Sequence, residues 1–335
     1  SFSFSSMTSS EAGSESASSA NKVDGLAIIR EPIIKNSKYI KCFFSSVIFI
    51  LIKFSQQFYP RNIYTDSIYL MKKSYALITG ASSGIGLEIA NNLASRGYNL
   101  ILTARREDRL SNITKEIAKK FDVKVDFISC DLSDINSPNE IFNFCNMKDY
   151  QVEVLINNAG YGIKTPFHKT PMEDEEDFIR VLGTSVIALT KIFLPSMMEC
   201  QNGKIMIVSS VASFSPPSKI QALYGPIKTF MNRFSDSINI NYNHLGISST
   251  ALCPGFTVTE FHTASGVQDE MDRVPSFLKF SAERIAKEGV EAMFAGKPIC
   301  VPTMTYKILV FMLKNFPASI LSLFGRKLAP GRYDK

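Results

Sequence analysis

The stretch 75-YALITGASSGIG-86 decides the fold of this chain. It starts as an apolar run of the strand type and passes into a glycine-rich turn, which a helix-length segment follows. The glycines allow a tight turn and a close backbone approach to a phosphate, and the free N–H groups at the start of the next helix favour an anion. The spacing G-x-x-x-G-x-G between a strand and a helix therefore predicts a nucleotide site. Its predicted residues are Gly80, Ser82, Ser83, Gly84, Ile85 and Gly86.

From Ser74 onwards, short apolar runs alternate with longer amphipathic ones. The predicted strands are 75–80, 98–104, 124–130, 152–160, 203–210 and 247–255. The predicted helices are 86–96, 106–120, 138–147, about 173–198 and a segment that follows Tyr224. This alternation predicts an α/β fold with a single doubly wound, Rossmann-type parallel sheet and helices on both faces. Ligands of such sheets bind at the carboxyl ends of the strands, so the informative residues should follow each strand.

The end of the second strand, "TARRE" (103–107), indicates which nucleotide binds. A site for NAD usually has Asp or Glu there, which holds the ribose 2′-hydroxyl. Here Arg105 and Arg106 occupy the position, and a guanidinium binds a 2′-phosphate through charge-assisted hydrogen bonds. Surface arginines at a helix start are the alternative, but they would oppose the helix dipole. The sequence therefore predicts NADP as the cofactor.

Two further strand ends carry candidate cofactor contacts. Asp131 and Leu132 in "CDLSD" could contact the adenine, or Asp131 could instead cap the next helix. The motif "NNAG" (157–160), with Asn158, Ala159 and Gly160, could close over the adenosine or tie the sheet together.

"ALYGPIK" (222–228) places Tyr224 and Lys228 on one face of the predicted last helix. Carbonyl reduction needs a proton donor, and a free tyrosine titrates near pH 10, whereas a nearby ammonium favours the phenolate. Ser209 or Ser210, at the end of the fifth strand, could polarise the substrate oxygen. The same helix also carries an apolar stripe that we expect to pack into the core, so one helix would both carry the catalytic pair and stabilise the fold. The stripe consists of Ile227, Phe230, Phe234 and Ile238.

Together the motifs TGASSGIG, NNAG, VSS, YxxxK and "CPGFTVTEF" resemble the short-chain dehydrogenases/reductases, and most closely a bacterial-type acyl or ketone reductase branch. The likeness covers about residues 72–262. It implies that Tyr224 is the acid/base, that Lys228 lowers its pKa and holds the nicotinamide ribose, and that Ser210 binds the substrate oxygen. It also implies a homo-oligomer formed through the helices from Glu173 and Tyr224. The implied contacts to nicotinamide and pyrophosphate are Pro254, Gly255, Thr257 and Thr259.

The chain departs from the family pattern in two places that bear on catalysis. The family usually has an Asn in the fourth helix that holds a water of a proton relay, and aligning "TSVIALT" with that pattern puts Ser185 there. Tyr224 follows Ser210 by fourteen residues where thirteen are usual, which implies a one-residue bulge in "FSPPSKI" (214–220).

The predicted substrate pocket is formed by residues 160–170, residues 213–222 and the segment after Thr259. Four phenylalanines in or near these segments suggest an apolar, lipid-like substrate. They are Phe167, Phe214, Phe256 and Phe261.

Residues 1–70 differ from the rest. The first 20 residues hold ten serines, so we expect disorder. The run 39–59 has an uncharged core of only eleven residues (42–52), whereas a membrane-spanning helix needs about 20. A membrane anchor or interfacial helix there is one interpretation. The other is that the functional unit begins at Met71, runs to residue 335 with a C-terminal helical tail, and is cytoplasmic, the first 70 residues being an extension.

Composition narrows the class of protein. The net charge is +6, of which residues 301–335 carry +5, so this basic tail is either a solvated helix or a contact to an acidic membrane surface. The six cysteines and three histidines show no metal-ligand spacing, and we expect neither a metal nor a nucleic-acid partner. The sequence therefore predicts an NADP-dependent oxidoreductase acting on a small-molecule carbonyl or alcohol. The alternatives are a catalytically weak NADP-binding regulatory module and a membrane-tethered reductase of lipids.

Overall fold

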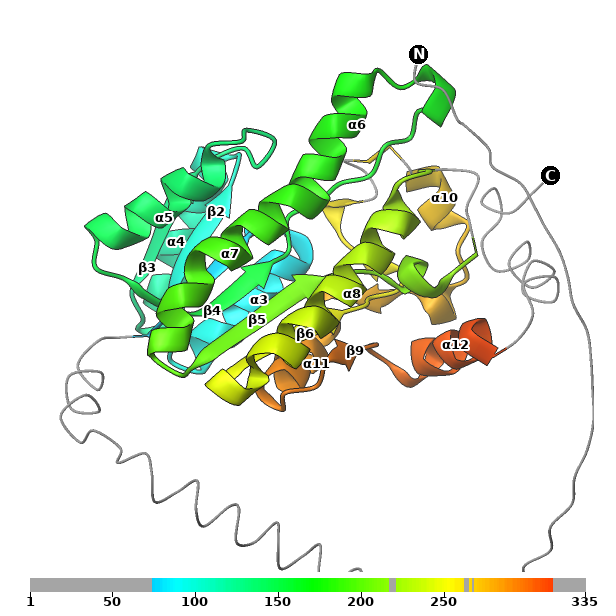
Figure 1. Cartoon of the computed structure of the whole chain (residues 1–335). Helices are drawn as coiled ribbons and strands as arrows, with labels where there is room; N and C mark the ends of the chain where they lie inside the picture. The colour runs from blue at the N-terminus through cyan, green and yellow to red at the C-terminus, as the bar shows by residue number, and fades with distance from the viewer. Residues whose placement is uncertain (1–73, 217–220, 262–264, 267, 316–335) are drawn as a thin grey trace, which may run out of the picture. The chain divides into compact units, whose positions relative to one another are not determined.

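The computed structural model describes residues 74–216, 221–261, 265–266 and 268–315 (Figure 1). The predictions for residues 1–70, for the part of the tail after residue 315 and for most of the expected bulge before Tyr224 lie outside the described residues.

The central feature is a seven-stranded, wholly parallel sheet with the strand order β3-β2-β1-β4-β5-β6-β9. The chain winds outwards from β1 in one direction and then from β4 in the other, so the predicted doubly wound sheet is confirmed. The seventh strand is only two residues long, which is too short to show a pattern in the sequence. The strands are β1 (Ser74–Thr79), β2 (Asn99–Ala104), β3 (Val125–Ser129), β4 (Gln151–Asn157), β5 (Gly203–Val208), β6 (Ile247–Leu252) and β9 (Ile299–Cys300).

Helices cover both faces of the sheet, as Figure 1 shows. One face packs against α3 (Gly84–Ser95), α4 (Glu107–Phe121) and α11 (Ala282–Phe294). The other packs against α5 (Ser137–Met147), α7 (Ser185–Glu199) and α8 (Tyr224–Tyr242). Successive strand side chains alternate between the two apolar layers, so that Leu77 lies in one and Ile78 in the other. The described part of the chain also contains α6 (Met172–Ile179), α10 (Gln268–Asp272), α12 (Met304–Asn315) and the short strands β7 (Thr257–Val258) and β8 (Phe280–Ser281).

The predicted helix 173–198 is continuous but not uniform. A π-helical turn, Arg180–Thr184, joins α6 to α7. The whole segment Met172–Glu199 is long and apolar enough to span a membrane by composition, yet over half of its most apolar part is buried within the protein. Its apolar side chains pack against the sheet through Leu189, Phe193 and Met197.

The predicted core stripe of α8 is wrong at Phe230, whose side chain is 54% exposed. The buried face of this helix is shifted by one residue from the predicted stripe. It is largely polar and carries Lys228, Asn232 and Ser235. Polar groups can be buried there because they hydrogen-bond the strands and loops below. Ser235 Oγ lies 2.7 Å from Ser249 Oγ of β6.

The loop after β6 is fastened to α12 by Tyr306, which is buried to 1% exposure. Its hydroxyl accepts a hydrogen bond from Phe256 N (2.9 Å) and donates one to Leu278 O (2.8 Å). Because one hydroxyl joins three segments, it fixes the position of the loop that carries Phe256.

We therefore predict that Tyr306→Phe lowers the free energy of unfolding by about 1–3 kcal/mol, because a buried N–H and a buried carbonyl lose their partner. Urea unfolding measures the loss. Tyr98→Phe is the matched control, since it removes a single 3.3 Å bond at a half-buried site and should cost less. Equal losses in the two variants would contradict the assigned role of Tyr306.

Candidate active site

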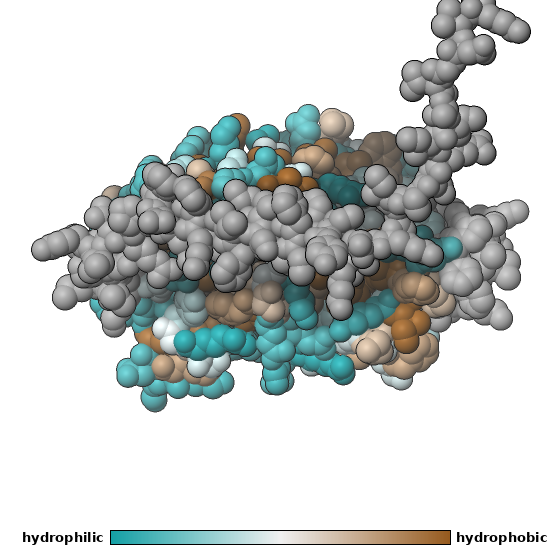
Figure 2. All heavy atoms as spheres, turned by 60° about the horizontal axis from the view of Figure 1, so that its bottom comes forward, coloured by the Kyte–Doolittle hydropathy of each residue, from teal (hydrophilic) through white to brown (hydrophobic). Residues whose placement is uncertain are grey.

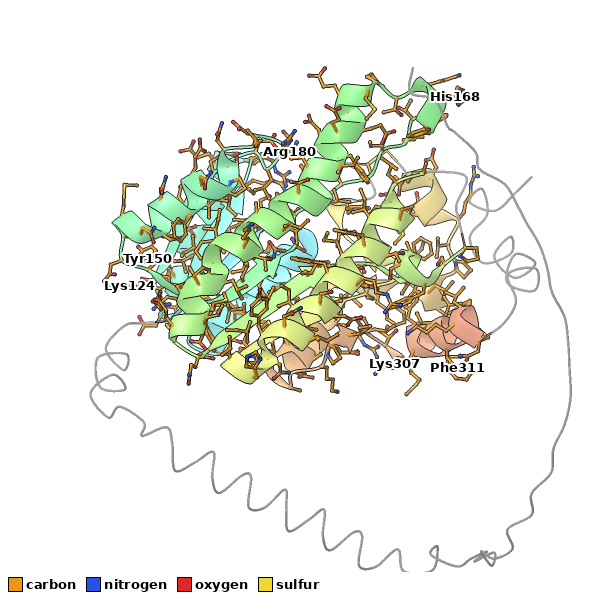
Figure 3. The ribbon with its side chains drawn as sticks, viewed as in Figure 1. Lys124, Tyr150, His168, Arg180, Lys307 and Phe311 are labelled. Atoms are coloured by element: carbon orange, nitrogen blue, oxygen red, sulfur yellow. The ribbon has the colours of Figure 1, made fainter. Side chains whose placement is uncertain are left out.

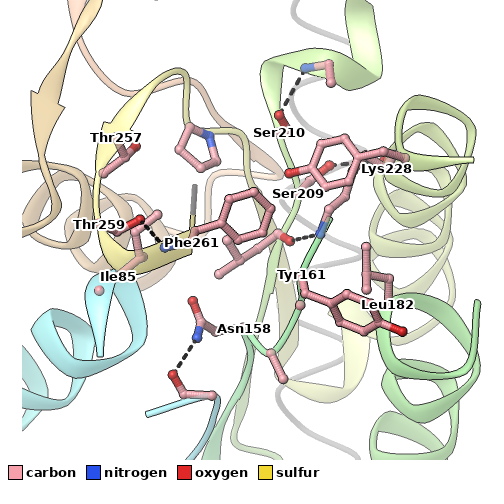
Figure 4. Close-up of a pocket in the computed structure, with 18 of the residues that line it drawn as sticks. Ile85, Asn158, Tyr161, Leu182, Ser209, Ser210, Lys228, Thr257, Thr259 and Phe261 are labelled. Atoms are coloured by element: carbon pink, nitrogen blue, oxygen red, sulfur yellow. Dashed lines mark hydrogen bonds between the residues drawn. The ribbon is translucent and has the colours of Figure 1, made fainter. Parts of the chain in front are cut away.

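A pocket of about 540 Å³ lies at the carboxyl ends of the central strands (Figure 4). It brings together every predicted site residue except Gly86 and Ser185. Residues that are far apart in the chain, from Gly80 to Leu313, thus share one cavity. Its position at the β1–β4 switch point is where ligands of doubly wound sheets bind.

The glycine turn has the geometry of a phosphate cradle. Gly80 (φ +66°) and Gly84 (φ +59°) adopt left-handed backbone conformations that favour glycine. α3 begins at Gly84, and no side chain caps its first N–H groups, because the capping position, Ser83, makes no such bond. These donors and the positive end of the helix dipole suit the pyrophosphate of a dinucleotide. Gly86 is needed for a different reason: the side chain of Asn158 packs directly against it, and a Cβ at this position would lie 2.4 Å from Asn158 Nδ2.

The NNAG loop ties the sheet together at the same place. Asn158 Nδ2 donates to the main-chain oxygens of Thr79 (2.9 Å) and Gly80 (3.1 Å). The N–H groups of Asn158 and Ala159 both donate to Thr79 Oγ1 (2.9 and 3.0 Å). The two interpretations left open by the sequence are both compatible with this loop, because it fastens β4 to the glycine turn and also lines the pocket.

The arginines after β2 differ in their contacts. Arg106 Nη2 donates to Ser82 Oγ (3.2 Å) and Ser83 Oγ (3.4 Å), so this guanidinium lies beside the glycine turn. The side chain of Arg105 is 69% exposed and lies 3.8 Å from a carboxylate oxygen of Asp131. Asp131 also accepts a bond from Ser133 N (3.0 Å), so it closes a turn rather than capping α5 at Asn136.

Glu260 is a pocket residue in the segment after Thr259, which the sequence predicts to line the pocket, but no motif assigns it a role. It accepts hydrogen bonds from Arg109 Nη1 (2.8 Å) and from both terminal nitrogens of Arg106 (3.3 Å). The bonds and charge of Arg109 lower the pKa of this carboxyl, and Arg106 adds to the effect. Glu260 thereby connects the loop after β7 to Arg106, one of the two arginines that we expect to face the cofactor. Only its position directly after Thr259 could have drawn attention to it.

Lys228 is buried to 6% exposure on the inner face of α8. Its Nζ donates a hydrogen bond (2.8 Å) to the carbonyl oxygen of Val208, the last residue of β5. The same Nζ lies 5.6 Å from the ring centre of Tyr224. Burial lowers the pKa of the ammonium from 10.5 to about 8. The buried thiol of Cys253 opposes this effect, but its own pKa is raised to about 11, so it is neutral over most of the pH range.

The structure distinguishes the two candidate serines. Ser209 is 2% exposed, and its hydroxyl donates to Lys228 O (3.0 Å). Ser210 Oγ accepts a bond from Ala212 N (3.1 Å) and lines the pocket, which leaves its proton to be donated to a ligand (Figure 4). Ser210 is therefore the better placed residue to bind a substrate oxygen.

Ser185 does not reach the pocket. It is buried, and its hydroxyl donates to Val181 O (2.9 Å) within its own helix. The helix presents Val181 and Leu182 to the pocket instead. Both residues belong to the π-helical turn Arg180–Thr184, which directly precedes Ser185. In the described part of this helix, no polar side chain faces the pocket.

The outer part of the pocket is apolar. Phe256 and Phe261 line it as predicted, and Phe261 lies 6.2 Å from the ring of Tyr224. Phe167 and Phe214 are not among its described lining residues: Phe167 is 57% exposed, and the ring of Phe214 lies under Lys314. The missing wall comes from α12, which contributes Leu309, Met312 and Leu313.

α12 also has an exposed apolar side. Met304, Ile308 and Phe311 are each more than half exposed. Figure 3 shows Phe311 with Lys307 at the edge of the molecule. Figure 2, in which the bottom of Figure 1 comes forward, shows hydrophobic and hydrophilic side chains side by side on the surface.

Comparison with known proteins assigns the family. The family model described as short chain dehydrogenase matches residues 74–270, more than half of the chain. The chain therefore belongs to the short-chain dehydrogenase family, whose members are usually NAD(P)-dependent oxidoreductases of alcohol and carbonyl groups.

Similar curated proteins include both enzymes and an inactive protein. Hydroxysteroid dehydrogenase-like protein 1 of Gallus gallus is 30% identical over 67% of this chain and 66% of its own length. Inactive hydroxysteroid dehydrogenase-like protein 1 of Homo sapiens is 29% identical over 66% and 68%. Very-long-chain 3-oxoacyl-CoA reductase of Bos taurus is 28% identical over 67% and 72%. The matched region thus spans about two thirds of these relatives.

Solved structures share the fold. A short-chain dehydrogenase of Sphingobium yanoikuyae in complex with NADPH superposes with a TM-score of 0.65 at 24% identity, over 75% of this chain and 95% of that one. The bulky-bulky ketone specific alcohol dehydrogenase of Comamonas testosteroni gives 0.62 at 23% identity, over 75% and 93%.

The buried lysine generates a prediction about stability. Between pH 8 and 10.5 the unfolded chain keeps the proton on Lys228 while the folded chain loses it, so stability should rise with pH in this window. We expect the parent to gain up to about 1.4 kcal/mol per pH unit relative to Lys228→Met, and no change below pH 8. Urea unfolding from pH 7 to 10 measures the difference. Lys191→Met, at an exposed lysine, should show no such trend, and parallel curves for parent and Lys228→Met would refute the assigned pKa.

Proposed function

We propose that this protein is an NADP(H)-dependent oxidoreductase that interconverts a carbonyl and an alcohol on an apolar, lipid-like substrate. The observation that carries the proposal is the meeting, in one pocket, of the glycine turn with Tyr224, Lys228 and Ser210. A nucleotide site alone would not need a buried ammonium beside a tyrosine.

The residues present fit a dinucleotide. Uncapped N–H groups at the start of α3 suit a pyrophosphate, and Arg105 and Arg106 with the two serines of the turn suit a 2′-phosphate. Pro254, Gly255, Thr257 and Thr259 also line the pocket, and they would contact the nicotinamide and the pyrophosphate. When bound, such a cofactor supplies or accepts a hydride.

The side chains of the pocket then handle the proton. The Tyr224 hydroxyl gives a proton to the substrate oxygen in reduction and takes it back in oxidation. The Ser210 hydroxyl donates a hydrogen bond to the same oxygen and polarises the carbonyl. The Lys228 ammonium, held by Val208 O, stabilises the phenolate that is left on Tyr224.

The apolar wall of α12 and the phenylalanines favour a long acyl chain as the substrate. Among the relatives, a very-long-chain 3-oxoacyl-CoA reductase supports a 3-oxoacyl compound as the first class to test. Of the two substrate types predicted for the branch, acyl compounds and ketones, we therefore favour acyl compounds.

A catalytically weak NADP-binding module is the second candidate, and two observations favour it. The helix beside the pocket offers Leu182 rather than a polar side chain that could hold a water. One of the relatives is named as inactive.

The decisive variant is Tyr224→Phe, which removes the hydroxyl and keeps the ring. We expect the turnover of NADPH with 3-oxoacyl esters, ketones or aldehydes to fall by at least about 100-fold, because a positioned acid/base contributes 10²–10⁴-fold. NADPH affinity, measured by fluorescence titration, should stay within about twofold. A parent that binds NADPH but turns over none of these substrates would establish the second candidate.

The cofactor preference has its own test. Arg105→Asp should weaken NADPH binding by about 10- to 100-fold, because a charge-assisted bond to the 2′-phosphate is replaced by repulsion, and NADH binding should not weaken. Titration of both cofactors gives the ratio of affinities. Arg109→Asp is the control, since Arg109 contacts Glu260 but does not line the pocket. An unchanged ratio in Arg105→Asp would show that this arginine is only a surface residue.

A further inference from the structure

α12 is apolar on two opposite sides. Its inner side is buried in the protein through Tyr306 and Val310. Its outer side carries three large apolar side chains at the spacing i, i+4, i+7, which places them on one stripe of the helix. A surface helix usually presents polar side chains outwards, so this outer stripe suits an apolar partner. The outer stripe consists of Met304, Ile308 and Phe311, each more than half exposed.

The charges around the outer stripe are positive. α12 contains Lys307 and Lys314 and no acid, and both lysines are exposed. Lys307 stands four residues before Phe311, and Figure 3 shows the two along the same edge of the molecule. In the described part of the chain, neither lysine forms an ion pair. The sequence continues, in residues 316–335, with four basic residues against one acid.

The same helix forms a wall of the pocket. Leu309 and Leu313 line the cavity from α12, and Met312 lines it while remaining 38% exposed. Met312 therefore lies where the cavity meets the surface. The helix is fixed in this place, because the Tyr306 hydroxyl bonds Phe256 N and Leu278 O. The outer stripe is thus presented on a rigid element, one helix away from the cavity.

Charge distinguishes the partners that could cover the outer stripe. A second copy of the chain, pairing through the same helix, would bring lysines towards lysines. Two apolar segments of this chain, residues 39–59 and 316–335, lie outside the described residues, and both are basic. Residues 39–59 contain Lys41 and Lys53 and no acid. An anionic lipid surface, by contrast, offers an apolar layer together with the opposite charge.

We propose that α12 is an interfacial helix that docks the protein on an anionic lipid surface. The outer stripe enters the acyl layer, and Lys307 and Lys314 contact the headgroup phosphates. In this orientation α12 lies between the bilayer and the pocket, with Met312 at the edge of the cavity. The inference goes beyond the proposed function, because the docking surface is the same whatever reaction the pocket catalyses.

The chain contains no tryptophan, so a single one reports on the contact directly. Phe311→Trp places the reporter in the outer stripe, and Ile240→Trp, at an exposed position of α8, is the matched control. The full-length variants are mixed with phosphatidylcholine vesicles that hold about one third phosphatidylserine. We expect the emission of Phe311→Trp to shift to shorter wavelength and to be quenched by lipids with brominated acyl chains. Ile240→Trp should show neither change.

Cosedimentation of the full chain with the same vesicles measures the affinity. The double variant Ile308→Glu, Phe311→Glu should weaken binding by at least about tenfold, because charges replace the side chains that enter the acyl layer. Lys307→Glu with Lys314→Glu should weaken it by at least about tenfold too, since each lysine near an anionic surface contributes about fivefold. Ile240→Glu should bind as the parent does. NADPH titration shows whether each variant is folded.

Three results would overturn the proposal. One is an emission of Phe311→Trp that stays unchanged while the chain sediments with the vesicles, since another segment would then be the anchor. The second is equal binding to vesicles of phosphatidylcholine alone, which would remove the role of the lysines. The third is a dimer without vesicles that Ile308→Glu, Phe311→Glu converts to a monomer, since the stripe would then be a subunit contact. None of these measurements needs turnover, so failure of the proposed function leaves this test intact.

Discussion

The hydrogen bond from Lys228 Nζ to Val208 O is the constraint on which the site depends. Removing an ammonium from water is costly unless a good acceptor replaces the lost hydration, and the last carbonyl of β5 is that acceptor. Ser209 Oγ returns a bond to Lys228 O, so strand and helix are joined in both directions. With these contacts made, the first turn of α8 cannot rotate, and Tyr224 is held at the pocket while Ser210 follows directly from the strand.

The polar face of α8 is a consequence of the same constraint. A helix that buries a lysine cannot present a purely apolar stripe to the sheet, because the residues above and below the lysine point the same way. Asn232 Nδ2 donates to Ser213 Oγ (2.8 Å), and Asn239 exchanges two bonds with the backbone of Ser249 in β6. These satisfied polar contacts set the helix in one register, whereas an apolar face would tolerate sliding.

The sequence allowed the doubly wound parallel sheet and most of the pocket to be predicted, because strand ends of a parallel sheet meet at one edge. The errors have local physical causes. Leu182 lines the pocket from this helix and Ser185 does not, and the π-helical turn at this point leaves no mark in an apolar pattern. The apolar spacing of α8 predicts that Phe230 is buried, but the burial of Lys228 turns a different face of the helix towards the sheet. The contribution of α12 to the pocket and the ion pairs of Glu260 arise from tertiary packing, which periodicity does not encode.

The two halves of the pocket come from opposite ends of the described chain. The glycine turn and the arginines lie within the first 33 described residues, 74–106, whereas the apolar wall requires Leu309, Met312 and Leu313. A nascent chain leaves the ribosome from its N-terminus, so the segments that carry the expected nucleotide contacts, up to Thr259, are synthesised before the acyl-binding wall. Until Tyr306 arrives, the carbonyl of Leu278 and the N–H of Phe256 have no buried partner from α12. The closing wall of the substrate chamber is therefore supplied by the last described helix, after every residue expected to contact the nucleotide.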